Sequence, residues 1–180
     1  MYAVIDVETG GFSKEKNGLC EIAVIIVDSS FSIVKSFSFL IQPYLRPESD
    51  ELVSYKDAAM EVNGIKMEDL LKAPKAEVVA KYIERVLIDQ NITTIVGHNV
   101  KSMDQKWTEY FLERFASGFK FKEAICTLDL ARKSNLDVEN NKLPTLCKYY
   151  GIVNNDEHRA SGDTHATYLV WMELKKELNE

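Results

Sequence analysis

Two acidic residues interrupt the apolar run with which this 180-residue chain opens. The segment Ala3-Val4-Ile5-Asp6-Val7-Glu8-Thr9-Gly10-Gly11 has the apolar start that is typical of a buried β-strand. Because side chains alternate between the two faces of a strand, Asp6 and Glu8 point to the same side. Neighbouring buried carboxylates repel each other and are costly to remove from water unless a cation lies between them. A divalent metal ion is the simplest such cation, so this strand alone indicates a metal-dependent enzyme.

The composition is that of a globular protein, and we expect a single domain spanning residues 1–180. Apolar residues make up 46% of the chain, enough for a core of its own. The net charge of −6 is unusual for a nucleic-acid binder, although an acidic metal site would account for much of it and leave room for a local basic patch. We expect no secretory leader, because the first predicted strand begins at Tyr2.

The apolar stretches and the cysteines of the sequence predict a cytoplasmic protein with no membrane partner. The longest apolar stretch near the start, Ile22 to Val27, is too short to span a bilayer. The three cysteines are scattered and form no CxxC pair, which is typical of free, mostly buried thiols in a reducing compartment.

The order of sequence patterns predicts an α/β fold. Strand patterns at Cys20–Val27 and over residues 31–41 follow the first strand after short turns, which favours antiparallel pairing. The later patterns are helical over 54–61 and 67–71, in a longer segment after Pro74, around Trp107–Phe115, and over 142–150 and 160–178, with strands at 92–96 and 124–127. This order predicts a mixed five-stranded sheet with an antiparallel three-stranded edge and helices on both faces.

Two later segments hold further chemical candidates. His98-Asn99 follows the fourth predicted strand, and Asp104 would open the next helix, where an acid is also an ordinary helix-starting residue. His158 precedes Asp163 by five residues, and the small residues between them would let a helix start pack closely on the sheet. Taken alone, Asp104 is better explained as a cap and His158 as a surface histidine.

Together the three segments resemble the DEDD 3′–5′ exonucleases of the His subtype, the family of the proofreading epsilon subunit of bacterial DNA polymerase III. Asp6 to Gly10 matches the first family motif, DxETG, and His158 to Asp163 matches the third, HxAxxD. The segment from His98 to Asp104 is similar to the second motif, with a gap of six residues where many relatives have five. The mammalian three-prime repair exonucleases look similar with the longer gap. The resemblance covers nearly the whole chain.

The resemblance implies a ribonuclease-H-like fold and phosphodiester hydrolysis with two divalent ions, Mg²⁺ or Mn²⁺. It implies that Asp6, Glu8, Asp104 and Asp163 are the metal ligands, and that His158 is the general base that takes a proton from the attacking water. Oxygen ligands suit these ions, and two ions can stabilise both the attacking and the leaving oxygen.

Further substrate contacts are expected near the strand ends. Thr9 and Gly10 would bring backbone N–H groups to the terminal nucleotide, and Phe12 is a candidate for stacking on its base. Asn99 either contacts the sugar-phosphate chain or has a structural role at the strand end. His98 is interpreted as structural, because oxygen ligands fill the metal site better.

The expected function is a free-standing 3′–5′ exonuclease acting on single-stranded or 3′-frayed DNA. An exoribonuclease or oligoribonuclease is the alternative, since ribonuclease T and oligoribonuclease look similar in these motifs and nothing in the sequence shows how a 2′-hydroxyl would be treated. A catalytically silent binding module on the same fold is disfavoured, because all four acids and the histidine are present. The sequence identifies no polymerase partner.

Overall fold

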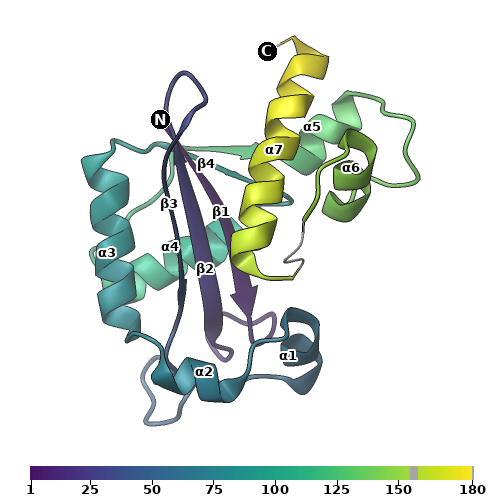
Figure 1. The fold of residues 1–180 in the computed structure, drawn as a ribbon. Helices are drawn as coiled ribbons and strands as arrows, with labels where there is room; N and C mark the ends of the chain where they lie inside the picture. The colour runs from purple at the N-terminus through teal and green to yellow at the C-terminus, as the bar shows by residue number, and fades with distance from the viewer. Residues whose placement is uncertain (155–157, 180) are drawn as a thin grey trace.

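The computed structural model describes residues 1–154 and 158–179 (Figure 1). The strands are β1 (Tyr2–Thr9), β2 (Leu19–Val27), β3 (Ile33–Leu40), β4 (Thr94–Gly97) and β5 (Glu123–Cys126). The helices are α1 (Asp57–Asn63), α2 (Met67–Lys72), α3 (Ala76–Asp89), α4 (Asp104–Phe115), α5 (Thr127–Lys133), α6 (Leu143–Tyr150) and α7 (Ala160–Leu178).

The five strands form one mixed sheet in the order β3-β2-β1-β4-β5. The pairs β1–β2 and β2–β3 are antiparallel, as their short connections require, and β1–β4 and β4–β5 are parallel. The predicted five-stranded sheet with an antiparallel three-stranded edge is therefore confirmed. All nine residues of β2 are buried, whereas β3 lies at the edge and is largely exposed.

The side chains of β1 alternate between two separate apolar layers. Ala3, Ile5 and Val7 belong to the larger core, which also takes in residues of α3 and α4. Val4 belongs to a smaller core that includes Trp171 of α7. Helices therefore cover both faces of the sheet, as predicted, with α7 crossing the face opposite α4 (Figure 1). By strand alternation, Asp6 and Glu8 lie on the α7 face.

The direction of α7 determines what it brings to that face. The rings of Trp171 and Tyr2 pack edge to face with their centroids 5.1 Å apart, so the middle of α7 lies over the start of β1. Asp163 lies eight residues earlier on α7, about 12 Å along the helix axis. Asp6 lies four positions after Tyr2, about 13 Å further along the strand. The start of α7 therefore lies over the end of β1.

Most predicted elements are present, with small shifts at their ends. Helix α7 has the bounds that the sequence predicted, and α1 begins at Asp57, three residues later than expected. Gly64 ends α1 with φ of 64°, a left-handed conformation that glycine adopts without strain. Helix α5 follows β5 without a connecting turn and was not predicted as a helix.

The three cysteines are buried and form no disulfide, as expected. None of the helices in the described part of the chain combines the length and the apolarity that crossing a bilayer requires.

Candidate active site

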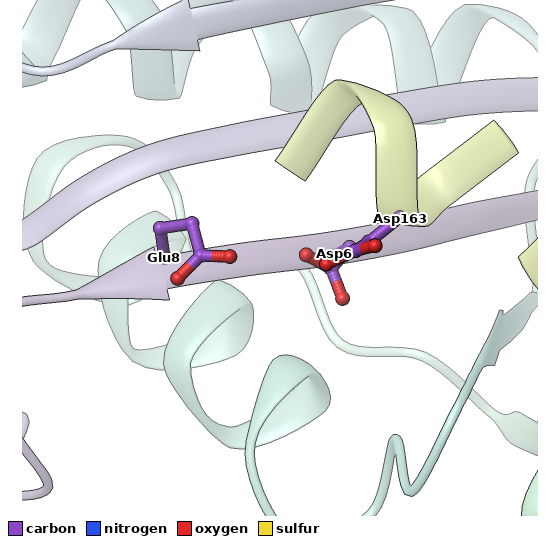
Figure 2. A group of neighbouring side chains, drawn as sticks. All are labelled: Asp6, Glu8 and Asp163. Atoms are coloured by element: carbon purple, nitrogen blue, oxygen red, sulfur yellow. The ribbon is translucent and has the colours of Figure 1, made fainter. Parts of the chain in front are cut away.

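Three acids from two elements converge above the end of β1. Asp6 and Glu8 project from β1, and Asp163 projects from the first turn of α7 (Figure 2). Each residue offers one carboxylate oxygen, and these three oxygens all lie within 4.8 Å of one another. We call these residues the acid trio. The trio joins the first and third sequence motifs in the way that the strand alternation and the direction of α7 require.

The trio is electrostatically unfavourable on its own. Burial first, and then the charges of Asp163, Glu21 and Asp104, raise the pKa of Glu8 from 4.5 to about 8. Burial and the charge of Asp104 also hold the pKa of Asp6 well above its usual value. A divalent cation would relieve both the repulsion and the desolvation. The donors are all carboxylate oxygens, which Mg²⁺ and Mn²⁺ prefer, so these residues fit such an ion.

Asp104 lies beside the trio and not within it. It is the first residue of α4 and is only 5% exposed. Its Oδ1 accepts a hydrogen bond of 3.2 Å from the backbone N–H of Val7, beyond the point at which β4 stops pairing with β1. Burial raises the pKa of Asp104 to about 7. This contact gives Asp104 a structural role, and its service as a metal ligand stays a prediction.

Two described residues that precede α7 contact Asp163. The backbone N–H of His158 donates to Asp163 Oδ2 at 3.1 Å, and Asn154 Nδ2 donates to Oδ1 at 2.7 Å. His158 is exposed and has φ of 64°. His158 and Asp163 line one cleft of about 330 Å³ together with Asn99 and the second-motif His98. The second and third motifs therefore meet at this cleft, which we call the His158 cleft.

A second cleft borders the trio at Glu8. It has a volume of about 280 Å³ and is lined by Glu8, Thr9, Gly11, Phe12 and Lys56, together with apolar residues of α1. Phe12 is 85% exposed at this cleft, an unusual position for a large apolar ring. We call it the Phe12 cleft. Because Glu8 lines this cleft and Asp163 lines the His158 cleft, the trio borders both clefts.

The glycine loop after β1 is shaped by close packing. A Cβ on Gly10 would lie 2.7 Å from Cδ1 of Tyr55 and 3.0 Å from the carbonyl oxygen of Ser54, so no other residue fits without movement. The Gly10 N–H donates to the carbonyl of Gly18 at 2.8 Å, and the Thr9 hydroxyl donates to the carbonyl of Gly11 at 2.8 Å. These bonds hold the rim of the Phe12 cleft, and the substrate contacts expected of Thr9 and Gly10 stay predictions.

His98 and Asn99 differ in their surroundings. The Nδ1 of His98 lies 2.9 Å from the hydroxyl of Thr127, and burial lowers the pKa of His98 to about 4, so the ring is neutral. This agrees with its interpretation as a structural residue. Asn99 is exposed at the edge of the His158 cleft with φ of 62°. Its predicted contact with a sugar-phosphate chain is compatible with that position but is not tested by it.

Sequence reasoning missed Glu21 on β2, and it considered Arg159 beside α7 only as one of several basic residues that could contact phosphates, not as the partner of Glu21. The Nε of Arg159 lies 2.9 Å from Oε2 of Glu21, whose side chain is only 3% exposed. The available signal was that Glu21 stands alone as an acid in an otherwise apolar strand, Leu19-Cys20-Glu21-Ile22-Ala23. Its position beside the trio depends on the strand register, which the sequence does not show.

Comparison with known proteins finds a matching family and several relatives. A family model described as "Exonuclease" matches residues 3–171. The DNA polymerase III subunit epsilon of Aquifex aeolicus is 30% identical over 179 residues, which cover 98% of this chain and 81% of that protein. The PolC-type DNA polymerase III of Staphylococcus aureus is 28% identical over 179 residues, covering 99% of this chain but only 12% of that protein.

The fold recurs in E. coli Exonuclease I, solved in complex with a dT13 oligonucleotide. The TM-score is 0.80 at 19% sequence identity, over 99% of this chain and 41% of that chain. The predicted ribonuclease-H-like fold is therefore confirmed. This chain spans less than half of Exonuclease I and about an eighth of the PolC-type polymerase.

Proposed function

Because this chain belongs to the exonuclease family, we propose that it is a metal-dependent enzyme that removes nucleotides from the 3′ end of single-stranded or frayed DNA. The observation that carries the proposal is the acid trio, which has three carboxylate oxygens within 4.8 Å of one another and borders two clefts. The trio offers the ligands for the reaction, and the clefts offer room for the nucleotides on either side of the scissile phosphate.

The carboxylates of Asp6, Glu8 and Asp163 would hold the divalent ions, Mg²⁺ or Mn²⁺, and Asp104, whose charge acts on Asp6, would complete the ligand set. When two such ions are bound, they stabilise the attacking and leaving oxygens of the phosphate. His158 lines the cleft that contains Asp163, and it would take the proton from the attacking water as a general base.

The two clefts would bind the end of the strand. Phe12, exposed in the Phe12 cleft, is placed to stack on a base, a contact that works for any sequence. Lys56 in the Phe12 cleft and Lys142 in the His158 cleft supply positive charge for the phosphates. This local basic rim resolves the apparent conflict with the net charge of −6.

DNA is the substrate that we favour over RNA. The relatives include proteins named for DNA polymerase III, and the matching fold of E. coli Exonuclease I was solved with a DNA oligonucleotide. The residues that line the clefts do not by themselves exclude a 2′-hydroxyl, so RNA is the alternative that the experiment compares directly.

The proposal is tested with a 5′-labelled single-stranded DNA and the RNA of the same sequence, each incubated with the protein and Mg²⁺ and resolved on a gel. We expect a ladder of labelled products that shorten progressively, faster for DNA. Asp6→Asn should abolish the ladder, and the exposed control Glu61→Gln on α1 should leave it unchanged. Immediate release of the labelled nucleotide would contradict the polarity. A wild-type protein without metal-dependent cleavage would contradict the enzyme itself.

The role of His158 requires a replacement that suits its backbone. His158 has φ of 64°, and asparagine tolerates this left-handed conformation better than alanine. In His158→Asn we therefore expect kcat to fall by about 10²- to 10⁴-fold, the usual contribution of a general base. The Mn²⁺ affinity measured by calorimetry should be unchanged. Equal losses of metal affinity and kcat would show that His158 supports the metal site and is not the base.

A further inference from the structure

Glu21 occupies a position where an acid is unexpected. In the antiparallel pairing of β1 with β2 it lies directly opposite Glu8, while small Ala23 lies opposite Asp6. Like charges directly opposite each other destabilise a strand pair, and this pair is next to two further acids of the trio. An uncharged residue would avoid that cost, so the structure must contain something that makes the charge of Glu21 favourable.

The start of α7 supplies three donors to Glu21. Arg159 Nε and Nη2 donate to Oε2 and Oε1 of Glu21 at 2.9 and 3.3 Å, a two-pronged contact of the geometry in which arginine binds carboxylates best. The backbone N–H of Ala160, the first residue of α7, donates to Oε2 at 3.3 Å. Arg159 precedes the helix, and no hydrogen bond from its own side chain caps the helix start. Glu21 on β2 therefore provides the acceptor that a capping residue would normally provide.

The same segment holds the third motif. Arg159 lies directly between His158 and the first residue of α7, and its carbonyl accepts the N–H of Asp163 at 3.0 Å in the first helical turn. Asp163 in turn accepts the backbone N–H of His158 at 3.1 Å. A continuous set of contacts therefore joins Glu21, Arg159, Asp163 and His158. The distance between Asp163 on α7 and Glu8 on β1 depends on where this set holds the helix start.

We propose that the Glu21–Arg159 pair is a positioning device, which fixes the first turn of α7 against β2 so that Asp163 and His158 meet Asp6 and Glu8 in the reactive arrangement. The pair also places a guanidinium next to carboxylates that repel each other, and it would moderate that repulsion while no ion is bound. The charge of Arg159 lowers the pKa of Glu8, against the larger effect of burial. This inference rests on the proposed function, because it assigns a task within that site.

A purely structural pair is the competing explanation. Exposed ion pairs contribute little, and buried pairs are often no more stabilising than apolar residues of similar size. Arg159 is 43% exposed, whereas Glu21 is almost fully buried, so stability alone gives no strong reason for this pair. The two explanations differ in their effect on turnover, since a structural pair changes the folded fraction and a positioning pair also changes kcat of the folded enzyme.

The experiment compares Arg159→Met, Glu21→Gln, the double variant and Arg159→Lys with the wild type. The matched control is Arg85→Met, which removes an exposed arginine paired with Asp89 at 3.5 Å on α3. For each protein, kcat and KM are measured on single-stranded DNA and corrected for the folded fraction from urea titration. Mn²⁺ affinity is measured by calorimetry, and hydrogen exchange of the amides over 158–163 is measured without metal.

We expect each single variant to lower kcat or Mn²⁺ affinity by about 10- to 100-fold, the usual effect of residues that orient metal ligands. KM should change little, Arg159→Lys should recover part of the loss, and the amides over 158–163 should exchange faster. The double variant should be no worse than the worse single variant, because both remove the same contact. The control should match the wild type.

Three results would overturn the inference. Arg159→Met and Glu21→Gln could keep the kcat and the Mn²⁺ affinity of the wild type. The losses of the two single variants could add up in the double variant, or the reduced folded fraction could account for all of the loss. A wild type without nuclease activity would contradict the proposed function instead. In that case the Mn²⁺ affinity and the hydrogen exchange of the same variants still decide whether the pair positions the trio.

Discussion

Replacing Glu8 by glutamine should stabilise the metal-free protein at alkaline pH while removing its activity. Glutamine has nearly the shape of glutamate but no charge, so the substitution takes one negative charge out of the acid trio and leaves its packing intact. The trio is strained as long as no cation is bound, because burial and three neighbouring acids all disfavour the ionised form of Glu8. Stability and activity are therefore expected to change in opposite directions.

The size of the effect follows from the pKa of Glu8. Its rise from 4.5 to about 8 corresponds to about 5 kcal/mol against the ionised side chain, at about 1.4 kcal/mol for each pH unit. Glutamine keeps a buried polar amide that must find its own hydrogen bonds, which offsets part of this gain. We therefore expect a net stabilisation of about 2 kcal/mol once Glu8 of the wild type is ionised.

The pH window follows from the direction of the shift. A carboxyl whose pKa is raised by folding binds more protons in the folded state, so its contribution to stability is complete below the unfolded value of 4.5 and is lost as the pH rises through about 8. The pKa of Asp104 is raised from 3.8 to about 7, so its contribution to stability is also lost as the pH rises over that range. The metal-free wild type should lose stability across this range, and the variant should lose less.

The assay is urea unfolding with a chelator present, at about pH 5 and about pH 8.5, repeated with Mg²⁺ at the higher value. The difference in unfolding free energy between the wild type and Glu8→Gln should be small at low pH and favour the variant at high pH. Mg²⁺ should stabilise the wild type more than the variant, since it binds only the folded site. Glu61→Gln, on an exposed face of α1, should show neither effect. A difference that is the same at both pH values would refute the reasoning.

Four further substitutions separate packing from binding. Glu84→Ala removes the buried carboxylate that accepts the N–H groups of the loop after α4, and urea unfolding should show a loss of about 2–4 kcal/mol. Gly10→Ala should lower the free energy of unfolding by about 1–3 kcal/mol, because the added Cβ would clash with the ring of Tyr55. Gly64→Ala has open space around it and should lower the free energy of unfolding by only about 1 kcal/mol, through backbone strain. Phe12→Ala should leave stability within about 0.5 kcal/mol of the wild type, while DNA binding measured by fluorescence anisotropy weakens by about 1–3 kcal/mol; unchanged binding would exclude the stacking role.

The fold was largely predictable because its strongest signals are local. The nineteen residues of α7 keep a helical spacing from Ala160 to Leu178, and the apolar run of β2 is uninterrupted except at Glu21. Helix α5 was missed because it has only seven residues and follows β5 directly, without a turn or a side-chain cap to mark its start. Short helices of this kind form mainly through tertiary packing, which a local pattern does not contain.

The site was predictable where a motif lies on one element and not where it depends on two. The shared face of Asp6 and Glu8 follows from strand alternation alone. The contact of Asp104 with the Val7 N–H depends on where β4 stops pairing with β1, and the contact of Glu21 with Arg159 depends on the register of β2 against β1. Registers are set by the packed sheet, so these two contacts were found only in the structure.

The position of α7 over β1 also determines when the acid trio can form. Strand β1 supplies Asp6 and Glu8, and the distant helix α7 supplies Asp163, so the ribosome delivers the first two acids long before the third. Contacts between such distant segments form late in folding, because the loop between them must close first. A growing chain therefore carries two solvated carboxylates without their partner, and under the proposed function we expect nuclease activity to begin only when α7 docks.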